Sequence, residues 1–363
     1  MASKSVSELG PASLVLGGGV GLGAYHVGAL EIFESAGLRI SSISGTSIGA
    51  VNGAIIASNP PGERLAKLKA FWGAIEVEAF PSAWFDPWGF GSTGHARRSR
   101  NWVNALTTGL AGNSRLFVPR AVSTGRGQSR SFYDNNIAAQ TLSSFVDFER
   151  LNDGPVRFCL AATDVIAGAA VFFDTAKGDR IEVEHLLASS SLIPAFEPIQ
   201  VGERLLADGG LACNLPLEAE IGPDRFGTPE PLCFALDLFT AGGGLPNPLN
   251  RVVENSLDLM FGIQTRMRLD GLLREWELKS KLREARQSAG RADNDTTGVD
   301  LFMMSYRGSE EDAGFAKPFD LSPATLLDRM EEGRMAAKRA LELALVMNAQ
   351  PHGSLKVHMV PAG

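Results

Sequence analysis

Cysteine and histidine are scarce in this chain of 363 residues, which has three of the first and five of the second. The odd number of cysteines, Cys159, Cys213 and Cys233, indicates reduced thiols in a reducing compartment. No two of them stand at CxxC spacing, and the histidines are scattered. The sequence therefore carries no metal signature, and we expect no metal and no cofactor.

Long apolar runs are also missing. No run approaches the roughly 18 apolar residues that a membrane-spanning helix needs, and Met1–Pro11 lacks the apolar centre of a signal peptide. The net charge of −7 argues against bulk attraction to nucleic acid. We expect a cytoplasmic protein with no nucleic-acid partner, whose contact with membranes is peripheral. The sequence leaves the oligomeric state open.

The most informative stretch is Gly45-Thr46-Ser47-Ile48-Gly49, between an apolar run at Ile40–Ser44 and a small-residue helical run at Ala50–Ala57. A serine with glycines two positions before and after it is the nucleophile-elbow pattern, a sharp strand-to-helix turn that exposes the hydroxyl. Gly45 and Gly49 would supply the backbone angles of that turn. The same pattern is common in plain turns, so Ser47 needs partners elsewhere to be a nucleophile.

A glycine-rich loop precedes this turn. It follows a short apolar strand at Ser13–Leu16 and opens a helix at Ala24–Ala36. Free N–H groups at a helix N-terminus stabilise negative charge, as an oxyanion site must. A nucleotide cradle is the alternative, but neither GxGxxG nor GxxxxGK[ST] fits the loop in frame. The loop consists of Gly17, Gly18, Gly19, Val20, Gly21, Leu22 and Gly23.

The order strand, glycine turn, helix, strand, turn and helix is typical of a parallel sheet covered by helices. We therefore predict an α/β protein, with a three-layer α/β/α fold, a mostly parallel central sheet and a nucleophile elbow at Ser47. Further strands are expected at Val156–Ala162, Ala170–Phe173, Arg204–Ala207, Leu232–Phe239 and Val299–Ser305.

The base that would activate Ser47 is better sought among carboxylates than histidines. Asp208 ends a predicted strand, and Gly209 and Gly210 after it allow close backbone approach. Because α/β sites assemble at the carboxyl ends of parallel strands, Asp208 is the preferred candidate. The histidines are poorly placed: His95 and His185 are not at strand ends, His352 and His358 lie in the tail, and His26 is expected to pack inside the first helix.

The glycine loop followed by Ala24-Tyr25, the Ser47 turn and the distant Asp208-Gly209-Gly210, in this order, resemble the patatin-like phospholipases. The resemblance covers roughly residues 12–240 and suggests a bacterial member with a helical C-terminal extension. Further similar stretches are Val146–Asn152, Ala162–Asp164, Ala188–Pro194 and Asp208–Pro216.

The resemblance implies a serine acyl hydrolase of the phospholipase A type, which cleaves carboxylic esters of lipids through an acyl-enzyme. Ser47 would be the nucleophile and Asp208 the base of a Ser-Asp dyad without histidine. Backbone N–H groups of Gly18, Gly19 and Val20 would hold the oxyanion. The expected partner is therefore a lipid ester substrate.

Two positions of the loop depart from the family. Val20 stands where glycine is common, and Leu22 stands where Arg or Lys is common. A β-branched valine restricts the backbone, and the missing cation removes charge stabilisation, so rate and substrate are affected more than the fold. Two alternatives stay open: an enzyme for other acyl substrates, such as thioesters or polyhydroxyalkanoates, and a catalytically weak lipid-binding or regulatory protein.

The predicted domains are a catalytic domain at 12–240 and a mainly helical extension at 241–363 that packs on it. In the extension, a long helical pattern spans Asn250–Gln287, with apolar residues at 257, 260 and 261. A final helix begins near Pro323, with Ser322 as its N-cap.

Residues 80–130 interrupt the catalytic domain as an excursion. Its first part, 80–90, is dense in aromatic residues and proline, which suits a packed lid or a membrane contact. Residues 91–130 contain seven arginines and no Asp, Glu or Lys. This composition suits either the binding of phosphate or carboxylate head groups or a solvated loop.

Overall fold

The computed structural model describes residues 6, 9–77, 94–120, 131–223, 225, 227–239, 249–289, 298–308, 314–347 and 353–361. The predicted aromatic stretch at 80–90 lies outside these residues.

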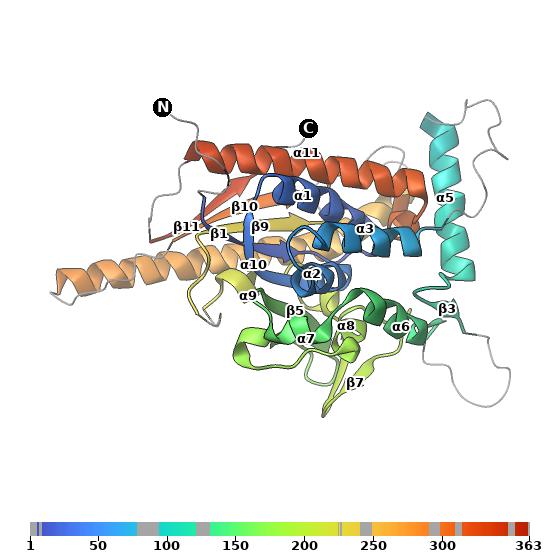
Figure 1. Ribbon diagram of the computed structural model, residues 1–363, viewed down its shortest axis with the longest axis horizontal. Helices are drawn as coiled ribbons and strands as arrows, with labels where there is room; N and C mark the ends of the chain where they lie inside the picture. The colour runs from blue at the N-terminus through green and yellow to red at the C-terminus, as the bar shows by residue number, and fades with distance from the viewer. Residues whose placement is uncertain are drawn as a thin grey trace.

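A nine-stranded sheet forms the centre of the molecule (Figure 1). Its order is β11-β10-β9-β1-β2-β5-β8-β7, with β6 paired to β5 outside this path. Neighbours from β11 to β5 are parallel, whereas β6, β7 and β8 attach in antiparallel pairs. The strands are β1 (Pro11–Leu16), β2 (Arg39–Thr46), β5 (Arg157–Asp164), β6 (Ala169–Asp174), β7 (Ile199–Val201), β8 (Arg204–Asp208), β9 (Leu232–Asp237), β10 (Val299–Ser305) and β11 (Leu355–Met359), and a separate two-stranded sheet pairs β3 (Val118–Pro119) with β4 (Tyr133–Asp134).

Helices cover both faces of the sheet. Successive strand residues point to opposite faces, and β1 follows this rule: Leu14 and Leu16 join the larger apolar core, and Val15 joins a second core. The larger core packs against α1, α2, α3 and α11, and the second against α9 and α10. This confirms the predicted three-layer fold with a mostly parallel sheet. The helices are α1 (Ala24–Ser35), α2 (Ile48–Ser58), α3 (Arg64–Ile75), α5 (Gly94–Ala111), α6 (Asn136–Phe145), α7 (Phe148–Asp153), α8 (Val183–Ser189), α9 (Leu217–Ile221), α10 (Leu249–Ser288) and α11 (Pro323–Met347), with short 3-10 turns η2 (Val20–Gly23), η3 (Thr175–Lys177), η4 (Gly209–Leu211) and η5 (Gly314–Phe319).

The first and last helices, α1 and α11, lie side by side (Figure 1). They approach so closely because each has a glycine at the crossing. A Cβ at Gly28 would lie 1.7 Å from the carbonyl oxygen of Met330, and one at Gly333 would lie 2.0 Å from that of Tyr25. Any larger residue at either position would force the backbones apart.

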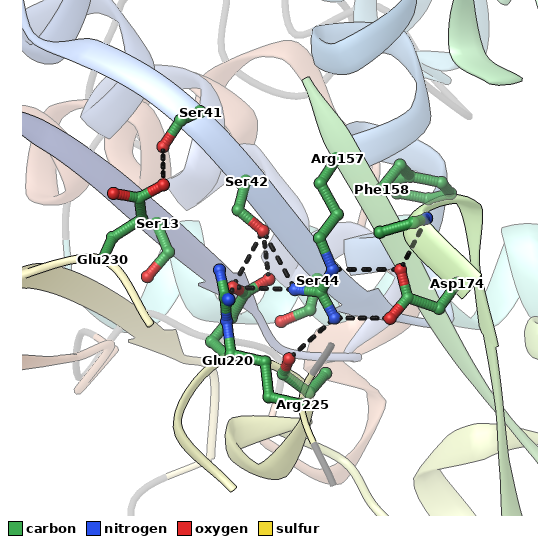
Figure 2. A network of polar contacts seen from close by, with 12 residues as sticks. Ser13, Ser41, Ser42, Ser44, Arg157, Phe158, Asp174, Glu220, Arg225 and Glu230 are labelled. Carbon is green, nitrogen blue, oxygen red and sulfur yellow. Dashed lines mark hydrogen bonds and ion pairs between the residues drawn. The ribbon is translucent and has the colours of Figure 1, made fainter. Parts of the chain in front are cut away.

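A buried polar network joins the N-terminal parts of β2 and β5 (Figure 2). Glu220 of α9 accepts a hydrogen bond from the Ser42 hydroxyl (2.8 Å) and forms an ion pair with Arg157 (3.1 Å). Arg157 also binds Asp174 at 2.6 Å, and Arg225 lies 3.6 Å from Glu220. The network therefore ties α9, β2, β5 and β6 together.

The region after residue 240 contributes more than helices. Strands β10 and β11 extend the same sheet beyond β9, so this region is part of the central layer. Only the first of these strands was expected. The boundary near residue 240 stays a prediction. None of the helices within the described residues has the length together with the apolar character that a bilayer crossing requires.

Candidate active site

The register of three neighbouring strands brings Ser47 and Asp208 together. Ser47 directly follows β2, whose last residue, Thr46, pairs with Ala161 of β5. The next residue of β5, Ala162, pairs with Asp208 at the end of β8. Ser47 and Asp208, which are far apart in the chain, therefore lie on opposite sides of β5 at the same height.

The direction of β8 differs from our expectation. Asp208 was placed at the end of a parallel strand, but β8 runs antiparallel to β5. Its residue Leu206 already pairs with Asp164, the last residue of β5, so β8 enters the sheet from beyond that edge. Asp208 reaches the site because β8 ends there.

Ser47 and Asp208 are in direct contact. The Ser47 hydroxyl donates a hydrogen bond of 2.7 Å to Oδ2 of Asp208. The backbone N–H of Gly210 donates one of 2.7 Å to Oδ1 of the same carboxylate. Both side chains are buried, with Ser47 7% and Asp208 5% exposed. The pair is thus shielded from bulk water.

Burial also changes the acidity of Asp208. Desolvation raises the pKa of this carboxyl to about 6, and the hydrogen bonds from Ser47 and Gly210 oppose the shift. Within the described residues, no cationic side chain forms an ion pair with it. A carboxylate with a pKa near neutrality is well suited to accept and return a proton.

The backbone is strained at two positions that face this site. Among the described residues, Ser47 (φ 54°) and Val20 (φ 49°) are the non-glycine residues with positive φ. Such conformations cost about 1–3 kcal/mol and persist only where the surroundings enforce them. At Ser47 the surroundings include Gly49, where a Cβ would lie 2.1 Å from the carbonyl oxygen of Leu16. The turn is therefore a sharp elbow.

Ser189 fixes the backbone of the elbow. Its hydroxyl accepts a hydrogen bond of 2.9 Å from the N–H of Ser47 and donates one of 2.7 Å to the carbonyl of Ala161. Ser189 is fully buried in the short helix α8. The backbone N–H of Ser47 thereby has a hydrogen-bond acceptor within the protein.

The glycine loop borders the serine. A Cβ at Gly18 would lie 3.1 Å from the Cβ of Ser47. The N–H of Gly18, however, donates to the carbonyl of Asn214 at 3.1 Å. In the part of the chain that the structure describes, the amides of Gly19 and Val20 have no hydrogen-bond acceptor. The Gly18 amide is thus already occupied, and the oxyanion role of the loop stays a prediction.

The other loop residues have packing roles. Gly17 donates its N–H to the carbonyl of Leu236 at 3.1 Å. A Cβ at Gly21 would lie 2.7 Å from the carbonyl oxygen of Pro318, and one at Gly23 would lie 2.7 Å from the Ile48 side chain. Leu22, which stands where a cation is common, is fully buried in the core.

The sequence model of the patatin-like phospholipase family matches residues 14–221, which is more than half of the chain. The chain belongs to this family.

Curated relatives are similar over the same part of the chain. An uncharacterized NTE family protein of Mycobacterium tuberculosis is 26% identical over 206 residues, which are 56% of this chain and 44% of the relative. Human patatin-like phospholipase domain-containing protein 6 is 26% identical over 207 residues, 57% of this chain and 12% of that protein. This patatin-like chain thus matches less than half of the length of either relative.

Two solved structures also resemble this patatin-like protein. VipD from Legionella pneumophila aligns with a TM-score of 0.41 and 13% identity, over 92% of this chain and 67% of that one. The type III effector protein ExoU aligns with a TM-score of 0.35 and 13% identity, over 93% and 54% of the two chains.

The described histidines of this patatin-like protein have partners other than Ser47. Nδ1 of His26 lies 3.1 Å from the Asn52 amide, and burial lowers the pKa of His26 to about 3, so it stays neutral. His185 caps α8 through the N–H of Glu182, and His358 lies 2.8 Å from Asp300. The side chains of His95 and His352 lie outside the described part.

Part of the arginine-rich excursion forms α5. Arg97 pairs with Asp328 of α11, and Arg120 pairs with Glu197 at 3.0 Å. These two arginines therefore tie the excursion to the rest of the molecule. A head-group role for the others stays a prediction, and Arg126 and Arg130 lie outside the described residues.

An apolar cavity of about 200 Å³ opens beside Ser47 and Asp208. The sequence did not reveal its walls, because they come from separate segments that meet only in the fold. The apolar residues at 257, 260 and 261 predicted a helix but not what it covers, and of these three Met260 is 55% exposed. Apolar side chains that line the cavity include Val51, Leu116, Phe117, Leu142, Leu187, Phe196, Phe239, Leu257, Phe261 and Phe319.

Proposed function

We propose that this protein is a serine acyl hydrolase that cleaves the carboxylic ester bonds of lipids. The observation that carries the proposal is the hydrogen bond of 2.7 Å between Ser47 and Asp208, made at a strained elbow. Membership of the patatin-like phospholipase family and the apolar cavity beside the pair support a lipid substrate. Because such esters reside in membranes, we expect peripheral contact with a membrane surface.

In the proposed mechanism, the Ser47 oxygen attacks the ester carbonyl while its proton passes to Asp208. The tetrahedral intermediate collapses, and the leaving alcohol takes that proton from Asp208. The acyl group is then bound to Ser47 as an ester. Water attacks this acyl-enzyme and gives a proton to Asp208. The second tetrahedral intermediate then collapses, Asp208 returns the proton to the Ser47 oxygen, and the fatty acid is released.

The N–H groups of Gly19 and Val20 are the proposed donors to the oxyanion. Their support is that they have no acceptor among the described residues and lie in the loop that borders Ser47. Loss of one such donor typically lowers turnover by about 10²–10³. The positive φ of Val20 would hold its N–H in one direction, at the expense of backbone strain.

A fluorophosphonate probe tests the proposal. We expect it to label the purified protein at Ser47, as read by mass spectrometry of peptides, and expect Ser47→Ala to abolish both labelling and ester hydrolysis. Ser35→Ala is the matched control, because Ser35 is exposed at the end of α1. The proposal would be wrong if folded wild-type protein took up no label, or if Ser47→Ala protein hydrolysed esters at the wild-type rate.

A substrate panel then separates the acyl classes. Phospholipids, simple carboxylic esters, acyl thioesters and hydroxyalkanoate oligomers are compared by kcat/KM with the same protein. Preference for thioesters or oligomers would keep the serine chemistry but replace the lipid substrate. Labelling without turnover of any of them would favour a lipid-binding protein.

A further inference from the structure

One wall of the cavity comes from residues beyond the family match, which ends at 221. Leu257 and Phe261 lie on α10, and Pro318 and Phe319 lie in η5. The segment that carries the nucleophile and the proposed base therefore does not complete the cavity by itself. The C-terminal region decides how much space is left for a substrate.

These four residues, called the C-terminal wall below, contact the turn after Asp208 and the glycine loop. A Cβ at Gly210 would lie 3.5 Å from the Phe261 ring, so the ring stands beside the turn that binds Asp208. The ring also packs on Phe239, with 4.8 Å between centroids. On the other side, the carbonyl of Pro318 lies against Gly21 of the glycine loop. A displacement of the wall would thus change the space next to the reacting atoms.

An ion pair joins the two pieces of this wall. Nζ of Lys317 in η5 lies 3.0 Å and 3.2 Å from the two carboxylate oxygens of Asp258 in α10. Asp258 is adjacent to Leu257, and Lys317 is adjacent to Pro318. The Lys317 side chain is only 5% exposed, and a lysine so deeply buried needs a partner. Arg329 of α11 adds a hydrogen bond of 2.7 Å to the carbonyl of Lys317.

The volume of the cavity limits the acyl chain that it can enclose. A cavity of about 150 Å³ holds benzene, with six carbons. In proportion, the cavity of about 200 Å³ would enclose about eight carbons. Longer chains would have to extend past the wall into solvent or membrane.

We propose that the C-terminal wall limits the enclosed part of the acyl chain to about eight carbons. Phe261 and Phe319 limit the enclosed volume, and Lys317 and Asp258 are positioning residues that hold the wall in place. The inference rests on the proposed function, because it assigns the cavity to the acyl group.

The test measures chain-length profiles in two ways. The kcat/KM of the wild-type protein is measured with p-nitrophenyl esters from butanoate to tetradecanoate. Binding of the matching neutral methyl esters to Ser47→Ala protein is measured by calorimetry. We expect both profiles to rise to octanoate and then level off or fall. Profiles that rise steadily to tetradecanoate would overturn the inference.

Enlarging the wall should shift this limit. In Phe261→Ala we expect the ratio of dodecanoate to octanoate to rise at least about tenfold in kcat/KM, since each methylene accommodated in an apolar pocket gives roughly that factor. Met267→Ala is the matched control on the same helix, because Met267 is 68% exposed. An unchanged ratio in folded Phe261→Ala protein would contradict the assignment of the wall.

The ion pair is tested by removing both charges together. Asp258→Asn alone removes one charge of a pair whose lysine is buried and can prevent folding, whereas Lys317→Met with Asp258→Leu removes both charges of the pair. We expect the folded double variant to show a broader chain-length profile than wild type. A wild-type profile in that variant would refute the positioning role.

The two proposals can fail separately. If the wild-type protein takes up no fluorophosphonate and hydrolyses no ester, the proposed function fails. The binding profile of the methyl esters still decides whether the cavity accepts chains of about eight carbons. If hydrolysis occurs with no chain-length limit, only the present inference fails.

Discussion

The strand pair β2 and β5 has a buried carboxylate near each end, and the two are held in different ways. At one end, Asp208 receives hydrogen bonds from a hydroxyl and an amide and, among the described residues, forms no ion pair. At the other, Glu220 faces the guanidinium groups of Arg157 and Arg225 (Figure 2). Burial raises the pKa of both carboxyls, but only at Glu220 do cations oppose it.

This difference separates the carboxylate proposed as the base from a structural one. A carboxylate bound by cations in a network holds neighbouring elements in place, and at Glu220 burial still raises the pKa to about 7 against the pull of the two arginines. A carboxylate that has only a hydroxyl and an amide as partners can take up a proton at modest cost. The same sheet therefore supports both functions, according to whether arginine is placed beside the acid.

Exchanging each acid for its amide should give the largest contrast in activity. We expect Asp208→Asn to lower kcat by about 10⁴, the usual effect of losing one member of such a catalytic unit. Glu220→Gln should keep kcat within about tenfold of wild type in the folded fraction, because Glu220 lies at the far end of the strands. Steady-state kinetics with one ester measures both. Equal losses of kcat in the two variants would contradict the different roles assigned to Asp208 and Glu220.

The stability of the same two variants should show the opposite order. Glu220→Gln removes the buried carboxylate that Arg157 and Arg225 share, although Arg157 keeps Asp174 as a partner. Breaking such a buried pair costs about 3–5 kcal/mol. Urea denaturation measures the free energy of unfolding. Arg180→Ala is the control, because its ion pair with Asp153 is exposed and should contribute at most about 1 kcal/mol. If Glu220→Gln lowered the free energy of unfolding only slightly, the network would not be important for stability.

The pH dependence of kcat/KM and of stability should identify Asp208 as the general base. Asp208 must be ionised to act as a base, so kcat/KM should fall as pH drops through about 6. Its pKa is higher in the folded protein than in the unfolded chain, so ionisation costs stability as pH rises from about 4 to about 6. Relative to wild type, Asp208→Asn should therefore gain up to about 3 kcal/mol of stability above pH 6 and lose this advantage below pH 4.

Comparing each variant with wild type at the same pH separates Asp208 from other buried acids. Asp237, for example, has its pKa raised by burial to about 7 and contributes its own pH dependence to both proteins. A difference in unfolding free energy that does not change between acid and neutral pH would contradict the assignment.

The smallest expected effect concerns the strain at Val20. Glycine adopts positive φ freely, so Val20→Gly should raise the free energy of unfolding by about 1 kcal/mol, measured by urea denaturation. Val118→Gly is the control: Val118 has no positive φ, so glycine there should destabilise by about 0.5–1 kcal/mol. A destabilised Val20→Gly protein would show that the valine side chain contributes more by packing than it loses by strain.

Local patterns were sufficient to predict much of the fold. The glycine turns, the alternation of strands and helices, and the strand at Val299–Ser305 follow from short-range sequence and agree with the structure. The candidate pair was also found from GxSxG and Asp-Gly-Gly. The reason for the glycines differs from our expectation, because Gly45 and Gly49 have no positive φ and a Cβ at Gly49 would instead collide with the carbonyl oxygen of Leu16. The roles of the pair in catalysis remain proposals.

The remaining features depend on contacts that no local pattern contains. The antiparallel direction of β8 and the addition of β11 depend on pairing with distant strands. The acceptor of the Gly18 amide is the carbonyl of Asn214, a residue far along the chain. One wall of the cavity likewise comes from α10 and η5. The sequence indicated the helix but not what it covers, and η5 was not predicted.

The close crossing of α1 and α11 has a consequence for the order in which the protein is made. β1 can pair with β2 soon after both leave the ribosome, but its other edge stays open until β9 emerges. The surface of α1 around Gly28 stays uncovered until Gly333 has been synthesised. Through most of translation, the segment with the nucleophile elbow therefore has an open strand edge and an uncovered helix, the two features that expose incomplete chains to aggregation.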